Sequence, residues 1–254
     1  MRVEALEVPY DLLCVGSGAA ELARAVESAW AWCLARPDSS ASGRPAHPLT
    51  VQRDDEPLAV VMDRLTPAVT TLAITERREE LVMFHACAVG DPVTGNAVAL
   101  YGPSGTGKTT LARTLCTELA YLSDETAAVA ADLRLVPYPK PLSVIAGGAD
   151  DPKDQVSPAD LGLVHPGERD YHLCALVQLD RDPGYDGQDA LLESLATVDA
   201  LPELVAQTSF TRELVRPLHR LAELAHRVGG VRRATYAEAE QLRPLVRSLL
   251  DGAL

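Results

Sequence analysis

Aromatic side chains, basic residues and long apolar runs are all scarce in this chain. Aromatics make up 4% of its 254 residues, so leucine, valine and alanine must fill the core. Lysine and arginine total 23 against 36 aspartates and glutamates, which gives a formal net charge of −13. Because a nucleic-acid surface needs clustered basic residues, we expect no nucleic-acid partner. No segment approaches the ~18 consecutive apolar residues of a membrane-spanning helix, and we expect no membrane partner.

A disulfide framework is also missing. The five cysteines are odd in number, widely spaced and mostly embedded in apolar runs, as buried thiols of a reducing compartment are. The N-terminus lacks the basic segment and apolar stretch of a secretory signal. These features predict a cytoplasmic protein.

The glycine-rich segment between Gly102 and Thr109 is the clearest motif, because it matches G-x-x-x-x-G-K-[ST] at every fixed position. Its glycines let backbone N–H groups turn inward around an anion, and the helix that follows points its positive end at the same place. We expect Lys108 to bridge the β- and γ-phosphates of a nucleotide such as ATP and the Thr109 hydroxyl to bind Mg²⁺. The residues assigned to nucleotide binding are Gly102, Pro103, Ser104, Gly105, Thr106, Gly107, Lys108, Thr109 and Thr110.

The context of this motif supports the assignment. Apolar strands are predicted at 81–89 and 97–101, joined by the turn 91–96, and an amphipathic helix is predicted from about 108 to 119. Elsewhere we predict extended segments at 3–15, 49–53, 58–62, 121–136, 175–179 and 231–235, helices at 19–35, 66–79, 211–228 and 236–250, and a loop at 36–48. The expected fold is mixed α/β, with a strand–helix subdomain over 1–55, a P-loop core over 56–200 and a helical part packed on the core over 201–254.

Two adjacent acids, Asp124 and Glu125, follow the predicted loop helix. A strand that returns beside the loop strand would bring both carboxylates to the γ-phosphate. One acid can hold Mg²⁺, directly or through water, and the other can accept a proton from an attacking hydroxyl. The alternative interpretation is a loop turn capped by the aspartate.

Together these residues resemble the catalytic domain of the HPr serine kinase family. The shared features are His85 in the strand before the turn, the loop from Gly102 to Thr109, and the acids of the segment Leu122-Ser123-Asp124-Glu125. The chain looks most like the small members of that group that phosphorylate a serine of lasso-peptide precursors. The resemblance covers roughly residues 81–144.

This resemblance implies a P-loop core related to phosphoenolpyruvate carboxykinase, with ATP and Mg²⁺ as the nucleotide and metal. It implies that Asp124 is the catalytic base, and that His85 lies beside the phosphates or the acid. Metal binding falls to Thr109, Asp124 and Glu125, although the family has two aspartates where this chain has Asp124 and Glu125. The family's second signature, linked to HPr engagement, has no match here.

Three functions are compatible with these motifs. The preferred one is an ATP- and Mg²⁺-dependent kinase that phosphorylates a hydroxyl, first of all a serine, of a peptide, protein or small molecule. The alternative is a regulatory or assembly ATPase without a phosphate acceptor, as a monomer or an oligomer. A carboxykinase is disfavoured because its metal-binding histidine and lysine set is not visible. Lys140, Arg169 and Arg181 are further candidates for charge stabilisation at the site.

Overall fold

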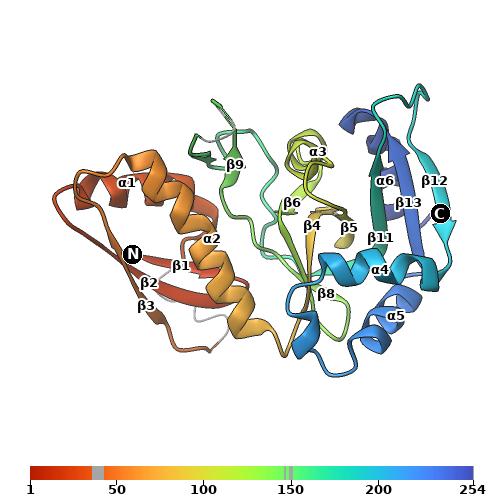
Figure 1. Ribbon diagram of the computed structural model, residues 1–254, viewed down its shortest axis with the longest axis horizontal. Helices are drawn as coiled ribbons and strands as arrows, with labels where there is room; N and C mark the ends of the chain where they lie inside the picture. The colour runs from red at the N-terminus through yellow and green to blue at the C-terminus, as the bar shows by residue number, and fades with distance from the viewer. Residues whose placement is uncertain (36–42, 146, 149–150, 254) are drawn as a thin grey trace. The chain divides into compact units, whose positions relative to one another are not determined.

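A computed structural model describes residues 1–35, 43–145, 147–148 and 151–253 of the chain. Strands and helices alternate along it, as Figure 1 shows, so the expected mixed α/β fold is confirmed. The chain forms two compact units, of which unit 1 comprises Met1–Arg77 and Tyr138–Gly162, and unit 2 comprises Arg78–Pro137 and Leu163–Leu254. The expected boundary at 55/56 falls inside unit 1 and the boundary at 200/201 falls inside a helix of unit 2. Most of the loop predicted at 36–48 lies outside the described residues.

Unit 1 combines a small sheet with two helices. Its elements are β1 (Arg2–Ala5), β2 (Val8–Val15), α1 (Ala19–Ala29), the 3₁₀ helix η1 (Ala31–Cys33), β3 (His47–Gln52), α2 (Leu58–Arg77), β9 (Leu142–Val144) and β10 (Asp154–Val156). β2 lies between antiparallel β1 and parallel β3, and β9 pairs with β10. The strand predicted at 58–62 is wrong, because those residues begin α2. Buried side chains at Val61, Leu65, Val69 and Ala73 follow the four-residue spacing of a helix.

Helix α2 is long and apolar enough to cross a membrane by length and composition alone. Its 18-residue window has a mean hydropathy of 1.3, and 39% of that window is buried inside the protein. A helix that contributes to the core of a soluble protein passes the same test, so this finding is weak evidence for a membrane segment.

Unit 2 contains the larger sheet, in the order β12-β13-β11-β5-β4-β7-β8, with β6 paired to β4. The strands are β4 (Val82–Gly90), β5 (Asn96–Tyr101), β6 (Ala120–Ser123), β7 (Thr126–Val129), β8 (Arg134–Val136), β11 (Tyr171–Arg181), β12 (Leu191–Leu195) and β13 (Val231–Tyr236). β11 is parallel to both β5 and β13. Because β8 also pairs with the start of β11, the sheet curls back on itself.

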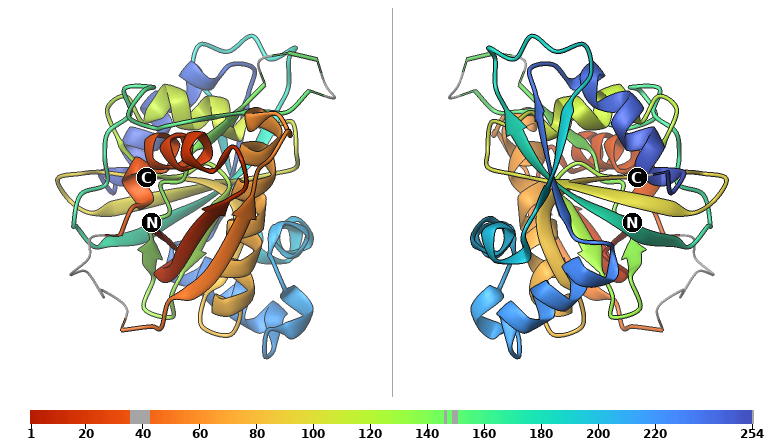
Figure 2. Two further views of the ribbon diagram at one scale, coloured as in Figure 1. Left: turned by 90° about the vertical axis from the view of Figure 1, so that its left-hand side faces the viewer. Right: turned by 90° about the vertical axis from the view of Figure 1, so that its right-hand side faces the viewer.

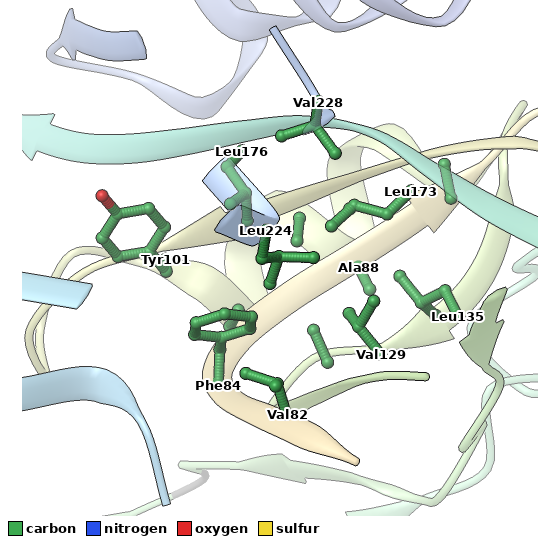
Figure 3. Close-up of a cluster of buried hydrophobic side chains, with 14 of the residues drawn as sticks. Val82, Phe84, Ala88, Tyr101, Val129, Leu135, Leu173, Leu176, Leu224 and Val228 are labelled. Carbon is green, nitrogen blue, oxygen red and sulfur yellow. The ribbon is translucent and has the colours of Figure 1, made fainter. Parts of the chain in front are cut away.

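Helices cover both faces of this sheet, as Figures 1 and 2 show. They are α3 (Lys108–Leu115), α4 (Thr197–Gln207), η2 (Thr211–Glu213), α5 (Pro217–Arg227), η3 (Ala239–Leu242) and α6 (Arg243–Leu250). Leu204 of α4 and Leu224 of α5 pack into one apolar cluster with the sheet, shown in Figure 3. Apart from Phe84, Tyr101 and Tyr171, this cluster consists of valine, leucine and alanine, which confirms the expectation from composition.

The structure differs from the predicted elements in the C-terminal part of the chain. The helix α4 was not predicted, and the single helix predicted at 211–228 is replaced by η2 and the shorter α5. The hairpin between β4 and β5 is confirmed: Asp91 Oδ1 accepts the backbone N–H of Val93 at 2.6 Å, and Gly95 lies at φ +82°. A Cβ on Gly95 would lie 2.7 Å from the carbonyl oxygen of Asp170, so the turn requires glycine there.

Candidate active site

The phosphate-binding loop connects the end of β5 to the start of α3. Gly105 and Gly107 have φ values of +90° and +85°, and a Cβ on either would meet no atom within 4 Å. Backbone conformation rather than crowding therefore explains both glycines. At Gly102 space is the constraint, because a Cβ added there would lie 3.2 Å from Leu179. Gly107 caps α3 without any side-chain hydrogen bond, so the cap residue does not compete with an anion for the first-turn N–H groups.

Lys108 folds back over this loop. Its Nζ donates to the carbonyl oxygens of Gly102 at 2.7 Å and Pro103 at 2.9 Å, and the residue is 7% exposed. Burial lowers the pKa of Lys108, and the nearby negative groups, including Glu125 and Glu203, oppose that shift. The ammonium is therefore held by neutral carbonyls in the place where phosphate oxygens would bind it.

The acidic pair lies in the turn between β6 and β7. Asp124 is 4% exposed, and its two carboxylate oxygens accept hydrogen bonds from Thr109 Oγ1 and from the Tyr121 hydroxyl, each at 3.0 Å. Burial raises the pKa of Tyr121 well above its ordinary value, which keeps its hydroxyl protonated as a donor. The carboxylate of Asp124 is thus fixed directly beside the phosphate-binding helix.

Ser123 caps part of this turn. Its Oγ accepts the backbone N–H groups of Glu125 at 3.2 Å and Thr126 at 2.9 Å. These two N–H groups are therefore satisfied by the serine, while Asp124 accepts the hydrogen bonds of Thr109 and Tyr121.

His85 joins the same neighbourhood from β4, where it pairs with Thr126 in register. Burial is the main cause that lowers the pKa of His85, and the Lys108 charge adds to it. Glu125 and Asp124 act in the opposite direction, as does a hydrogen bond with the Glu125 backbone. A histidine with a lowered pKa is neutral at pH 7 and can position a hydrogen bond without adding positive charge.

The structure therefore gathers Lys108, Thr109, Asp124, Glu125 and His85 around the loop. Thr110, Pro103 and Ser104 are exposed on the loop and the first turn of α3. Tyr121 and Tyr236 were not found from the sequence, although the Tyr236 hydroxyl donates to the backbone oxygen of Thr106 in the loop. The one signal in the sequence that could have pointed to Tyr121 is its position three residues before Asp124.

The other cations proposed from the sequence lie apart from this group or are already engaged. Arg169 lies beside Gly95, at the end of β5 opposite the phosphate-binding loop. Arg181 lies at the carboxyl end of β11, and its Nε donates to the carbonyl of Ala237 at 3.0 Å. Lys140 is buried in unit 1, where it donates to the carbonyl of Pro141.

A hydroxyl and a carboxylate at 3.0 Å are the hard oxygen donors that Mg²⁺ takes together with phosphate oxygens and water. In the described parts of the chain, no group of three or more histidine, cysteine, aspartate or glutamate side chains could hold a metal ion. Thr109 and Asp124 therefore fit a magnesium ion shared with a nucleotide better than a metal held in a cage of protein ligands.

Comparisons with known proteins give one family-model match and one structural match of low identity. Residues 98–134, from β5 to β8, match the model of the ATPase family associated with various cellular activities (AAA). The structure of the HPr(Ser) kinase/phosphatase from Coxiella burnetii matches at 12% identity and a TM-score of 0.32, covering 67% of this chain and 95% of that chain. No curated protein sequence matches the chain.

Proposed function

We propose that this protein is an ATP- and Mg²⁺-dependent kinase that transfers the γ-phosphate to a hydroxyl, with a peptide serine as the first acceptor to test. The observation that carries the proposal is the pair of hydrogen bonds that fix Asp124 beside Thr109 at the start of α3. A P-loop alone serves hydrolysis as well as transfer. A buried carboxylate held at the γ-phosphate end of the loop is what a hydroxyl acceptor also requires.

In the transfer step, the acceptor hydroxyl gives its proton to Asp124 as its oxygen forms a bond to the γ-phosphorus. The bond from that phosphorus to the bridging oxygen breaks, and its electron pair leaves with ADP. Lys108 and the loop N–H groups stabilise the charge on the transferred group. Magnesium bound at Thr109 and Asp124 would neutralise part of the triphosphate charge. His85, which is neutral at pH 7, and Glu125 would orient the groups around the transferred phosphate.

A regulatory ATPase is the second candidate, favoured by the match of residues 98–134 to the AAA model. In that case water replaces the acceptor hydroxyl and the nucleotide state controls a partner. The sequence resemblance to kinases of lasso-peptide precursors favours the kinase and a peptide acceptor. We further expect a cytoplasmic protein, an expectation that five free thiols favour, and we expect no nucleic-acid or membrane partner.

The decisive experiment pairs two variants. Asp124→Asn keeps the size of the side chain but cannot take the acceptor's proton, so single-turnover transfer should fall about 10²- to 10⁴-fold while ATP binding persists. Lys108→Ala should weaken ATP binding itself, because the only lysine of the loop is lost. Transfer is followed with γ-labelled ATP and serine peptides by mass spectrometry, and binding by calorimetry.

Two results would count against the proposal. Phosphate transfer by Asp124→Asn at nearly the wild-type rate would show that Asp124 is not the catalytic base. Hydrolysis of ATP by the wild type without transfer to any peptide, protein or small-molecule hydroxyl would favour the regulatory ATPase.

A further inference from the structure

A row of polar side chains crosses the sheet of unit 2 where its parallel strands end. Strand pairing aligns Tyr101 of β5 with Gln178 of β11, and Gln178 with Arg233 of β13. Paired residues point to the same face of a sheet, and Tyr101 packs with side chains of α4 and α5 on that face. The preceding row on this face is apolar and consists of Ala99, Leu176 and Val231. The carboxyl ends of parallel strands are where ligands of α/β sheets bind.

Two polar atoms of this row are buried without a partner. Tyr101 is 0% exposed, and neither its hydroxyl nor Oε1 of Gln178 has a hydrogen-bond partner among the described residues. Figure 3 shows the Tyr101 hydroxyl at the margin of the apolar cluster, directed away from Leu224 and Val82. Buried polar atoms of native proteins are almost always satisfied, so an unpaired donor and an unpaired acceptor in one row of the sheet indicate that something else completes them.

Charged groups surround the Tyr101 hydroxyl. Burial raises the pKa of Tyr101; the charge of Glu203 on α4 adds to that shift and the charge of Arg233 opposes it. Glu203 also opposes the fall in the pKa of Lys108 that burial causes, so its charge acts on the phosphate-binding loop as well. Gln207 Nε2 donates to Glu203 Oε1 at 2.9 Å and steadies that carboxylate. Arg233 is partly exposed and pairs in register with Gln178 on one side and Glu193 on the other.

We propose that Tyr101, Gln178, Glu203 and Arg233, named here the strand-end cluster, bind the phosphate acceptor as a serine-bearing peptide with a basic side chain near the serine. The proposal rests on the kinase activity proposed above and adds the acceptor site and its charge preference. Tyr101 and Gln178 offer a donor and an acceptor that match the carbonyl and N–H of a peptide group. Arg233 can donate to further peptide carbonyls.

The charge balance of the region selects the sign of the ligand. Glu193 pairs with Arg233 in register, and Asp180 follows Gln178 by two residues on the same face. Three carboxylates, with Glu203 as the third, therefore stand against two cations, the guanidinium of Arg233 and the ammonium of Lys108. The excess of negative charge attracts a basic group of the acceptor.

The test begins with a peptide library in which a fixed serine is flanked by varied positions. The full-length protein, ATP and Mg²⁺ are added, and phosphopeptides are sequenced by mass spectrometry. We expect lysine and arginine to be preferred over glutamate at one flanking position by about fivefold, the ratio that a single half-exposed charge pair supports. Equal use of acidic and basic peptides would contradict the proposal.

Point variants then locate the site. Tyr101→Phe removes a hydroxyl that has no partner, so the melting temperature should be unchanged or higher, while the KM for the selected peptide should rise about 3- to 10-fold with the KM for ATP unchanged. Glu203→Gln should weaken the preference for basic peptides, because it removes one of the three carboxylates, and Glu203→Lys should weaken it further. Asp199→Asn, which removes the same charge from the exposed first turn of α4, is the matched control and should keep the wild-type preference.

The outcomes separate the two proposals. A wild-type protein that phosphorylates no peptide contradicts the kinase assignment. A wild type that phosphorylates peptides, with Tyr101→Phe and Glu203→Gln retaining its KM and preference, contradicts the strand-end cluster alone. A rise in the KM for ATP instead of the peptide would assign the cluster to the nucleotide.

Discussion

Burial decides the protonation of His85, although charges of both signs lie around it. Its pKa is lowered from the ordinary value of 6.5, with burial as the largest cause and Lys108 as the next. The unfolded chain therefore binds a proton at this residue at a higher pH than the folded chain does. His85 therefore favours the folded state fully above about pH 6.5. This contribution to the free energy of unfolding is lost as the pH falls from there through the folded-state pKa.

His85→Gln lacks this titration and provides the test. Urea unfolding of the nucleotide-free protein at about pH 7.5 and pH 5 gives the free energy of unfolding of both proteins. We expect the stability of the wild type relative to His85→Gln to decrease toward pH 5. An equal difference at the two pH values would show that His85 titrates alike in both states.

At the scale of helices and strands, α4 and α2 show what periodicity cannot settle. Pro202 lies inside α4, although proline disfavours the interior of a helix. Its missing N–H deprives only the carbonyl of Val198 of a partner, and that residue is 72% exposed to solvent. The apolar run at the start of α2 suits a strand as well as a helix by composition. Strands β4 and β5, their hairpin and the loop were predictable because each carries its own local signal.

The candidate site divides in the same way. The sequence located Lys108, Thr109 and Asp124, since glycine conformation and the loop's spacing are local properties. It could not locate Tyr101 or Glu203, because their neighbours come from β11, β13 and α4, far along the chain. Partners brought together by sheet register have no signature in a single sequence.

Leu204→Ala tests whether α4 is held by the core of unit 2. Leu204 is 0% exposed and belongs to the large apolar cluster, so truncation should lower the free energy of unfolding by about 2–5 kcal/mol. Val198→Ala on the same helix removes an exposed side chain and should change it by less than about 0.5 kcal/mol. Denaturant unfolding measures both, and similar losses for the two variants would place α4 outside the core.

For the molecule as a whole, the nucleotide site and the large apolar cluster both belong to unit 2. Every residue of that cluster comes from 78–137 or 163–254. We therefore expect a chain of residues 78–254, with 138–162 replaced by a flexible linker, to fold and to bind an ATP analogue within about tenfold of the full-length affinity, since a domain with its own core can fold alone. Circular dichroism measures whether this shortened chain folds, and calorimetry measures its affinity for the ATP analogue. An unfolded shortened chain would show that unit 2 needs unit 1 to fold.

The parallel pairing of β5 with β11 also affects how the chain is made. β5 pairs with β4 through a short hairpin, but β11 begins 70 residues after Tyr101 (171 − 101). At ~5–20 residues per second, translation leaves one edge of the strand Asn-Ala-Val-Ala-Leu-Tyr unpaired for roughly 4–14 s. An open apolar edge is a template for pairing with another chain. The strand that carries the phosphate-binding loop is thus the segment of the nascent protein most in need of protection from aggregation.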